Sequence, residues 1–141
     1  MPVAGLSSRM NDSDLLEAAR DAQSEAYVPY SEYTVGAALK TADGEVFVGC
    51  NIENANYSNS LHAEEVAIAE AVKNGYGEFE TLAVSSGERD AVTPCGMCRQ
   101  TLAEFCDEDL RVLCDAGADG VREHRLGQLL PETITRETLG K

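Results

Sequence analysis

The sequence has no tryptophan, few aromatic residues (6%) and a shortage of basic residues. Its 11 Lys and Arg stand against 25 Asp and Glu, so the formal net charge is −14 over 141 residues. Nucleic acids and anionic membranes bind cationic surfaces, and the charge therefore disfavours both as partners. The excess of carboxylates is also typical of proteins that stay hydrated in a salt-rich cytosol, which concerns habitat and not chemistry.

Long apolar runs are missing as well. No segment reaches the roughly 18 uninterrupted apolar residues of a membrane span, and Met1 to Leu15 contains no apolar stretch of signal-peptide length. We therefore expect a soluble, cytoplasmic protein. Hydrophobic residues make up 43% of the chain, enough for one core, so residues 1–141 are expected to form a single domain.

The cysteine count of five does not suit a disulfide framework. Two of the five form Cys95-Gly96-Met97-Cys98, a spacing used for metals or redox chemistry in reducing compartments. Cys50, Cys106 and Cys114 lack paired spacing and are expected to be small buried hydrophobic residues. His124 lies between two charged residues and is expected to face solvent.

The apolar periodicity predicts helices alternating with strands. A first helix is capped by Asn11 or Ser13 and ends before Pro29, and an Asp43-Gly44 pair indicates a hairpin. A strand, a helix and a further strand follow one another near the end, which favours a parallel pair. The remaining expected helices are 61–72, 95–105 and 126–130, and the expected strands are 33–39, 45–50, 81–85, 110–114 and 121–124.

Two segments carry the chemistry, His62-Ala63-Glu64 and Pro94-Cys95-Gly96-Met97-Cys98, each at the start of an expected helix. One imidazole and two thiolates supply three ligands to Zn²⁺ and leave the fourth tetrahedral position open, as in catalytic sites. The two thiolates also neutralise the dication. Because helix N-termini favour negative charge, we expect lowered thiol pKa values there.

Glu64 is expected to act beside the metal. Two residues along a helix correspond to a rotation of roughly 200°, so Glu64 and His62 would not chelate side by side. A carboxylate in that place can take a proton from zinc-bound water and return it to a substrate nitrogen and a leaving group. H-x-E followed by P-C-x-x-C is the established signature of zinc deaminases.

Three other interpretations compete with this one. A redox C-x-x-C would follow a strand in a thioredoxin-like unit and would not require His62 or Glu64. A closed structural zinc site would need a fourth protein ligand, and the other cysteines and His124 lack the spacing for it. The same three ligands could also stabilise a non-catalytic binding module.

From about Asp14 to Pro131 the chain resembles the small, tetrameric class of cytidine deaminases. Five motifs carry the resemblance, in order: residues 33–39 (YTVGAAL), 49–55 (GCNIENA), 62–64 (HAE), 94–100 (PCGMCRQ) and 129–131 (LLP). The resemblance implies an α/β fold in three layers, α-β-α, around a mixed sheet of about five strands. It also implies one Zn²⁺ per chain, a homotetramer, and hydrolytic deamination of cytidine and deoxycytidine to the uridine forms with release of ammonia. A modified or antibiotic aminopyrimidine nucleoside is the alternative substrate.

The resemblance also implies roles for single residues. The metal ligands would be His62, Cys95 and Cys98, and Glu64 would be the catalytic carboxylate. Asn51 and Glu53 would hydrogen-bond the ribose hydroxyls, and Tyr33 would pack on the nucleoside. The backbone of Ala63 would meet the pyrimidine carbonyl, and the carbonyl of Thr93 would meet the leaving amino group.

Three positions depart from the pattern of that class. Most of its members carry Cys where this chain has His62, and Arg where it has Glu65. The two changes are coupled by charge, since three thiolates on Zn²⁺ leave −1 for an Arg to offset, whereas one imidazole and two thiolates leave zero. At the position of Ile134, many members of the class carry an aromatic residue that reaches a neighbouring subunit's site, so the resemblance predicts weaker stacking on the base here.

Overall fold

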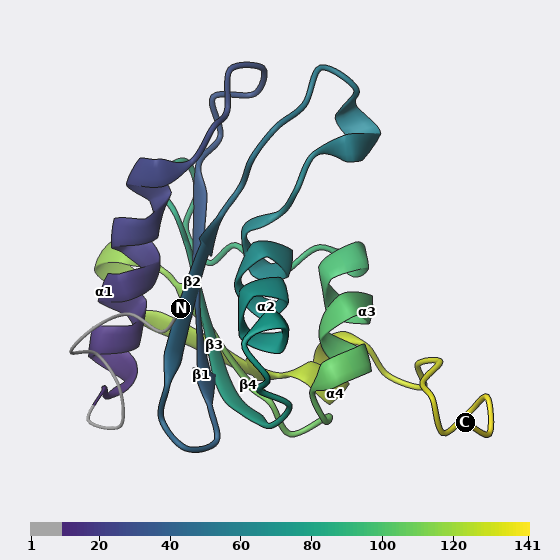
Figure 1. The fold of residues 1–141 in the computed structure, drawn as a ribbon. Coiled ribbons are helices and arrows are strands. Elements are labelled where there is room, and N and C mark those ends of the chain that lie inside the picture. Colours follow the sequence, from purple (N-terminus) through teal and green to yellow (C-terminus); the bar gives the residue numbers. More distant parts are fainter. Residues whose placement is uncertain (1–9) are drawn as a thin grey trace.

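The computed structural model of the protein describes residues 10–141. These residues form a five-stranded mixed sheet. Helices lie on both faces of the sheet (Figure 1). The strand order is β2-β1-β3-β4-β5. Only β3 and β4 run parallel, and the other neighbours are antiparallel. The strands are β1 (Val35–Thr41), β2 (Val46–Cys50), β3 (Phe79–Ser86), β4 (Arg111–Asp115) and β5 (Val121–Arg125). The predicted three-layer α/β fold is confirmed.

Helix α1 covers one face of the sheet, and α2 and α3 cover the other (Figure 1). No helix within residues 10–141 combines the length and the apolar character needed to cross a membrane. The expectation that Met1 to Leu15 lacks a signal peptide lies mostly outside the described residues. The helices are α1 (Asp12–Ala22), α2 (Ala63–Lys73), α3 (Gly96–Phe105) and α4 (Leu126–Leu129), with short 3₁₀ turns η1 (Gln23–Glu25), η2 (Tyr57–Asn59) and η3 (Gly117–Asp119).

The connections follow from local sequence. Gly44 has φ 95°, a conformation that glycine adopts at no steric cost, and it closes the predicted hairpin between β1 and β2. Helix α3 connects β3 to β4, which leaves these two strands parallel, as the strand–helix–strand order predicts.

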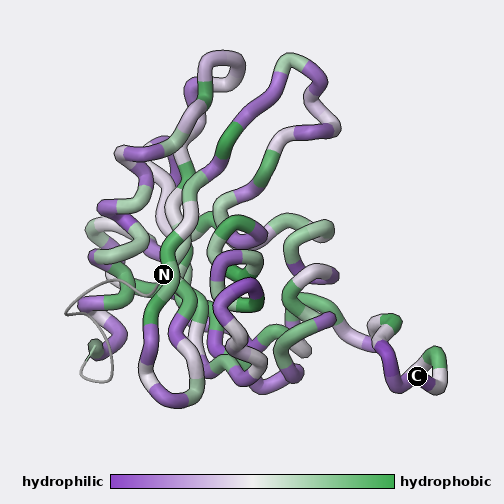
Figure 2. The backbone as a smooth tube through the Cα atoms, viewed as in Figure 1, coloured by the Kyte–Doolittle hydropathy of each residue, from purple (hydrophilic) through white to green (hydrophobic). Residues whose placement is uncertain are grey.

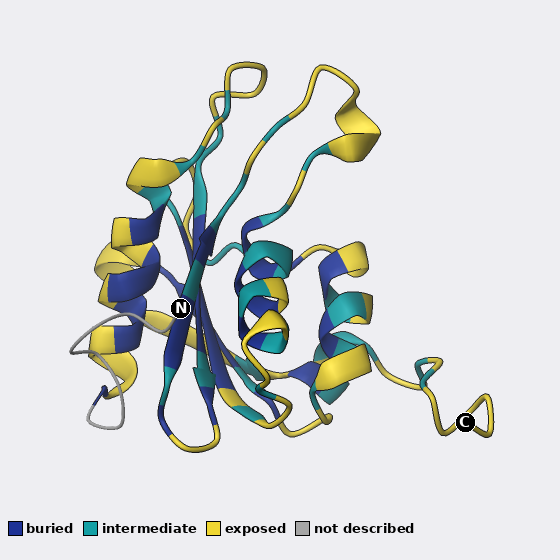
Figure 3. Ribbon diagram, viewed as in Figure 1, coloured by how far each residue is buried: buried dark blue, intermediate teal, exposed yellow. Residues whose placement is uncertain are grey.

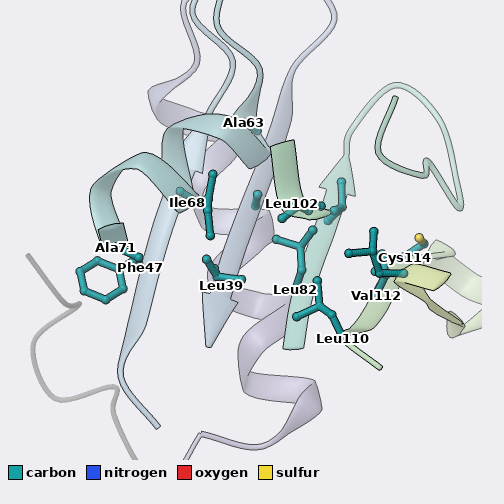
Figure 4. Close-up of a cluster of buried hydrophobic side chains, with 14 residues drawn as sticks. Leu39, Phe47, Ala63, Ile68, Ala71, Leu82, Leu102, Leu110, Val112 and Cys114 are labelled. Atoms are coloured by element: carbon teal, nitrogen blue, oxygen red, sulfur yellow. The ribbon is translucent and has the colours of Figure 1, made fainter. Parts of the chain in front are cut away.

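The strands alternate between two cores because successive side chains point to opposite faces of a sheet. On β3, Leu82 and Val84 join the core beneath α2 and α3, and Ala83 joins the core beneath α1. Figure 4 shows the first core, in which Phe47, Leu39 and Ile68 pack together with Leu82. Hydrophobic colouring follows these buried strands in Figure 2.

Two arms, residues 26–34 and 51–62, extend beyond the sheet and are mostly exposed (Figure 3). They account for two errors in the predicted boundaries. Tyr33 lies before β1 instead of inside it, because its N–H and C=O bond to side chains, the Ser31 hydroxyl and the Asn51 amide. Leu61 precedes α2 because its backbone pairs with Ile52 in a β-bridge.

Candidate active site

The metal-ligand candidates meet where α2 and α3 begin. His62 is the N-cap residue of α2, Cys95 is the N-cap residue of α3, and Cys98 lies in the first turn of α3. His62 Nδ1 lies 3.2 Å from Cys95 Sγ and 3.4 Å from Cys98 Sγ. Within the described residues these three donors form the one group placed to hold a metal ion, all within 4.8 Å of one another.

The donor set fits zinc. Tetrahedral bonds of about 2.05 Å to nitrogen and 2.3 Å to sulfur imply an N···S separation of about 3.5 Å, close to both values found here. Three protein ligands leave a fourth position open. A closed structural site would need another protein donor, and none of the described residues joins the group.

The pKa of the Cys98 thiol differs from the sequence-based expectation. Burial raises the pKa of Cys98, and the nearby carboxylate of Glu64 raises it further. The expected lowering by the helix N-terminus is therefore wrong for Cys98, because desolvation exceeds it. A dication must hold this sulfur as thiolate, so metal binding releases a proton here.

Glu64 lies in the first turn of α2 and is only 5% exposed. Burial raises the pKa of its carboxyl group, and the backbone N–H of Glu64 itself and nearby His62 oppose the rise in part. Glu64 also lines a small cavity together with His62 and Cys95. A carboxyl group whose pKa is raised toward neutrality suits a proton shuttle.

This cavity has a volume of about 180 Å³ and brings together six of the nine predicted site residues. Tyr33 and Glu53 are not among its lining residues, and Cys98 is buried beside it. Two lining residues, Val35 and Val92, carry no chemical signal and were not predicted. The predicted residues in the lining are Asn51, His62, Ala63, Glu64, Thr93 and Cys95.

The two residues predicted to bind ribose make different contacts. Asn51 accepts a hydrogen bond from the Val35 N–H (2.9 Å) and donates one to the Tyr33 carbonyl (2.7 Å). Glu53 accepts from the backbone N–H groups of Tyr30 and Ser31, each at 3.1 Å, and from the Ser31 hydroxyl. Asn51 thus ties β1 to the second arm, and Glu53 joins the two arms.

Arg99 supports the segment before Cys95, a role that the sequence did not indicate. Its guanidinium donates to the Pro94 carbonyl (2.7 Å), to the Thr93 hydroxyl (3.1 Å) and to the Leu129 carbonyl (2.8 Å). Thr93 is therefore held from the side of α3 while it lines the cavity.

The remaining thiols and His124 stay outside the metal group. Cys114 is buried, as predicted, whereas Cys50 and Cys106 are partly exposed. Burial raises the pKa of Cys114 to about 11, so this thiol stays neutral. The prediction that His124 faces solvent is wrong: the side chain is half-buried, and its Nε2 has no hydrogen-bond partner among the described residues.

A larger open groove, about 840 Å³, separates α3 from the C-terminal segment. It contains none of the predicted site residues, and carboxylates such as Glu104 and Glu132 are prominent in its lining. The small cavity, not this groove, holds the chemical groups.

Comparisons with known proteins agree with this geometry. Residues 9–114 match the sequence model of the cytidine and deoxycytidylate deaminase zinc-binding region. The chain is 40% identical to the cytidine deaminase of Sporosarcina psychrophila over 130 residues, which cover 92% of this chain and 96% of that protein. It is 37% identical over 134 residues to the probable cytidine deaminase of Dictyostelium discoideum, covering 92% of this chain and 90% of the relative.

Solved structures give the same result. The cytidine deaminase from Burkholderia pseudomallei superposes with a TM-score of 0.84 at 42% identity, covering 89% of this chain and all (100%) of that one. The enzyme from Mycobacterium tuberculosis gives a TM-score of 0.76 at 38% identity, over 86% of this chain and 95% of that one. With the zinc donors, the fold and the matched sequence in agreement, this chain belongs to the zinc-dependent cytidine deaminase family.

Proposed function

We propose that this protein deaminates cytidine and deoxycytidine hydrolytically, yielding uridine and deoxyuridine with release of ammonia, as a step of pyrimidine salvage. The observation that carries the proposal is a buried carboxyl group, Glu64, in the same cavity as the donors of an open zinc site. When bound, zinc lowers the pKa of a coordinated water toward neutrality and so supplies the nucleophile.

Glu64 moves the proton. Its carboxylate accepts the proton that the attacking water loses as oxygen adds to the ring carbon bearing the amino group. It passes this proton to the adjacent ring nitrogen, then takes the remaining proton of the added hydroxyl and delivers it to the amino group, so that the carbonyl forms as the C–N bond breaks and ammonia departs. Burial raises the pKa of Glu64 above that of an ordinary carboxyl group, which favours its acceptance of a proton from water.

The backbone around the cavity orients the base. Ala63 is the first residue of α2, so its N–H has no partner within the helix and can donate to the pyrimidine carbonyl. The Thr93 carbonyl would accept from the amino group, on a segment that Arg99 holds in place. Asn51 and Glu53 would contact the ribose, and Tyr33 would pack against the nucleoside.

Glu64→Gln tests the proposal. It keeps the size of the side chain but removes the proton shuttle, so we expect turnover of cytidine to fall by at least about a hundredfold with zinc content unchanged. Glu104→Gln, which changes an exposed carboxylate on α3, serves as the matched control. Full activity of Glu64→Gln, measured by ammonia release, would refute the proposed role of Glu64.

A panel of aminopyrimidines tests the substrate class. Turnover of cytidine and deoxycytidine is expected, with little on free cytosine, because cytosine makes no contact at the sugar end. Turnover restricted to a modified nucleoside would favour the alternative substrate. A zinc-loaded, folded wild type that deaminates no aminopyrimidine would favour a non-catalytic binding module.

We further propose a cytoplasmic homotetramer in which residues 1–141 form one catalytic domain and each site is completed by a neighbour. The cavity of about 180 Å³ is smaller than the roughly 300 Å³ or more of most small-molecule sites, so one chain supplies too little wall. Exposed apolar side chains on the two arms, such as Tyr57 at 75%, are available for subunit contacts. Light scattering at high salt tests the assembly, and a fully active monomer would contradict it.

A further inference from the structure

The first arm turns back on itself at Ser31, a residue that no motif singled out. The Ser31 hydroxyl accepts a hydrogen bond from the Tyr33 N–H at 3.0 Å and donates to Oε2 of Glu53. Glu32, which lies between Ser31 and Tyr33 in the sequence, has φ 57°, and this backbone conformation lets the chain fold back over Ser31. One hydroxyl group thus joins two residues that stand 20 positions apart in the sequence, Tyr33 and Glu53.

The Glu53 carboxylate accepts hydrogen bonds from the first arm and retains capacity to accept one from a ligand. A carboxylate has about four acceptor positions, and three are occupied here, two on Oε1 by the N–H groups of Tyr30 and Ser31 and one on Oε2 by the Ser31 hydroxyl. Within residues 10–141 no other donor reaches this carboxylate, which leaves one position on Oε2 for a ligand. The same hydrogen bonds, that of the Ser31 hydroxyl first, lower the pKa of Glu53, so the group is an ionised acceptor at neutral pH.

The backbone conformation around Ile52 also sets the direction in which the Glu53 side chain points. Ile52 forms bridges to both Tyr27 and Leu61, so this stretch is extended. In extended backbone, residues i and i+2 point to the same side. Asn51 lines the cavity, and Glu53 therefore points to the same side, farther along the arm, where the sugar of a base-bound nucleoside would lie.

We propose that Ser31 is a positioning residue for sugar recognition: its hydroxyl fixes the Glu53 carboxylate so that the one free acceptor position meets a ribose hydroxyl. This inference rests on the proposed function, since it assumes that a pyrimidine nucleoside is the substrate. Ser31 itself does not touch the reacting atoms. Its effect is confined to the binding of nucleosides that carry sugar hydroxyls.

The test is Ser31→Ala assayed on two substrates, cytidine and 2′,3′-dideoxycytidine, which lacks both hydroxyls that Glu53 could accept from. We expect KM for cytidine to rise about tenfold, the size of one charge-assisted hydrogen bond, with kcat little changed. KM for dideoxycytidine should stay within about twofold of wild type. Ser31→Thr keeps the hydroxyl group and is expected to restore KM for cytidine.

Ser58→Ala is the matched control, because Ser58 lies on the second arm and its hydroxyl bonds, within the described part of the chain, to Asn56 alone. It should leave both KM values unchanged. Equal rises for both nucleosides in Ser31→Ala, a loss confined to kcat, or no recovery in Ser31→Thr would each overturn the inference while leaving the deaminase assignment intact. A wild type inactive on both nucleosides would instead refute the proposed function, and this inference with it.

Discussion

The two helical layers use their helix N-termini differently. On the α1 face, Asn11 caps the helix in the usual way: its side chain accepts from the Asp14 N–H at 2.8 Å, and the Asp14 carboxylate accepts from the Asn11 N–H. On the opposite face, the N-cap positions of α2 and α3 are occupied by His62 and Cys95, whose side chains face each other.

This difference separates an N-cap residue that stabilises the fold, Asn11, from N-cap residues that supply metal ligands, His62 and Cys95. Asn11 satisfies backbone donors of its own helix, which stabilises the fold. His62 and Cys95 present their donor atoms to a metal ion, and the first residues of α2, Ala63 and Glu64, line the cavity. The α1 layer can therefore be altered at a cost in stability alone, whereas changes at the start of α2 or α3 affect the site.

On each face of the sheet one helix packs closely against a glycine, α1 against Gly36 and α2 against Gly49. Replacing either glycine by alanine should have the largest effect of the changes predicted for this protein. A Cβ on Gly49 would lie 2.3 Å from the Ala63 carbonyl oxygen, and a Cβ on Gly36 would lie 2.0 Å from the Ala19 carbonyl oxygen. We expect each variant to lose about 3 kcal/mol of unfolding free energy in urea titrations.

Only Gly49→Ala should also lower the zinc content of the folded protein, because it displaces the residue next to His62. Gly77→Ala, which meets nothing within 4 Å, controls for the change of residue type. Equal zinc content in the Gly36 and Gly49 variants would contradict the separation of the two layers.

The α1 layer also contains an ion pair whose contribution depends on pH. The nearly buried Asp115 accepts from Arg20 Nε at 2.8 Å and from the Ser85 hydroxyl at 2.8 Å. We expect Asp115→Asn to cost about 1–2 kcal/mol at pH 7, less than a fully buried pair, because the Arg20 side chain is 42% exposed and screened. Arg20 also pairs with Glu17, whose side chain is 62% exposed. Glu17→Gln is therefore the control, and we expect it to change the unfolding free energy by no more than a few tenths of a kcal/mol.

The stability contributed by this ion pair depends on pH because the pKa of Asp115 differs between the folded and the unfolded protein. Arg20 lowers the pKa of Asp115 in the folded protein below the usual 3.8. The stabilisation is therefore present above about pH 4 and is lost as pH falls through the folded value, where Asp115 takes up a proton. Urea titrations should show the gap between wild type and Asp115→Asn closing below that pH, and a constant gap would exclude the ion pair as its cause.

On the face of the sheet covered by α2 and α3, His62→Cys would change the charge of the metal site. A third thiolate makes the zinc site negative beside Glu64, so we expect zinc to be retained and turnover to fall about tenfold near neutral pH. Adding Glu65→Arg should restore part of the rate. The recovery should be incomplete, because Glu65 Oε1 accepts from the His62 backbone N–H at 2.7 Å and arginine cannot replace that acceptor. Equal rates for wild type, single and double variants across pH would show the charge argument to be wrong.

The smallest effect is expected at the α1 cap. Asn11→Ala should cost about 1 kcal/mol of unfolding free energy and leave zinc content and kcat/KM unchanged. Ser13, the other cap suggested by the sequence, lies inside α1, so Ser13→Ala should change little. A fall in activity for Asn11→Ala, measured on cytidine, would show that the α1 layer also affects the site.

Much of the site could be predicted because its signals are local. Cys95 and Cys98 are separated by one helical turn, and His62 and Glu64 begin another helix, so short spacings already indicated which groups could act together. The contact between Ser31 and Glu53 could not be predicted, since it joins two loops that no periodic pattern describes. The sequence predicts a strand at Tyr33 because β propensity carries no information on the side-chain hydrogen bonds that keep this residue out of β1.

The donor types, the alternation of buried side chains and the turn at Gly44 could be derived from the amino-acid sequence, since each depends on residue chemistry over a few positions. Folding was needed to bring His62 within 3.2 Å of a sulfur atom 33 residues away, and to bury Cys98 and Glu64 enough to raise their pKa values. Distance and desolvation depend on packing between segments remote in the chain, and no local pattern contains them.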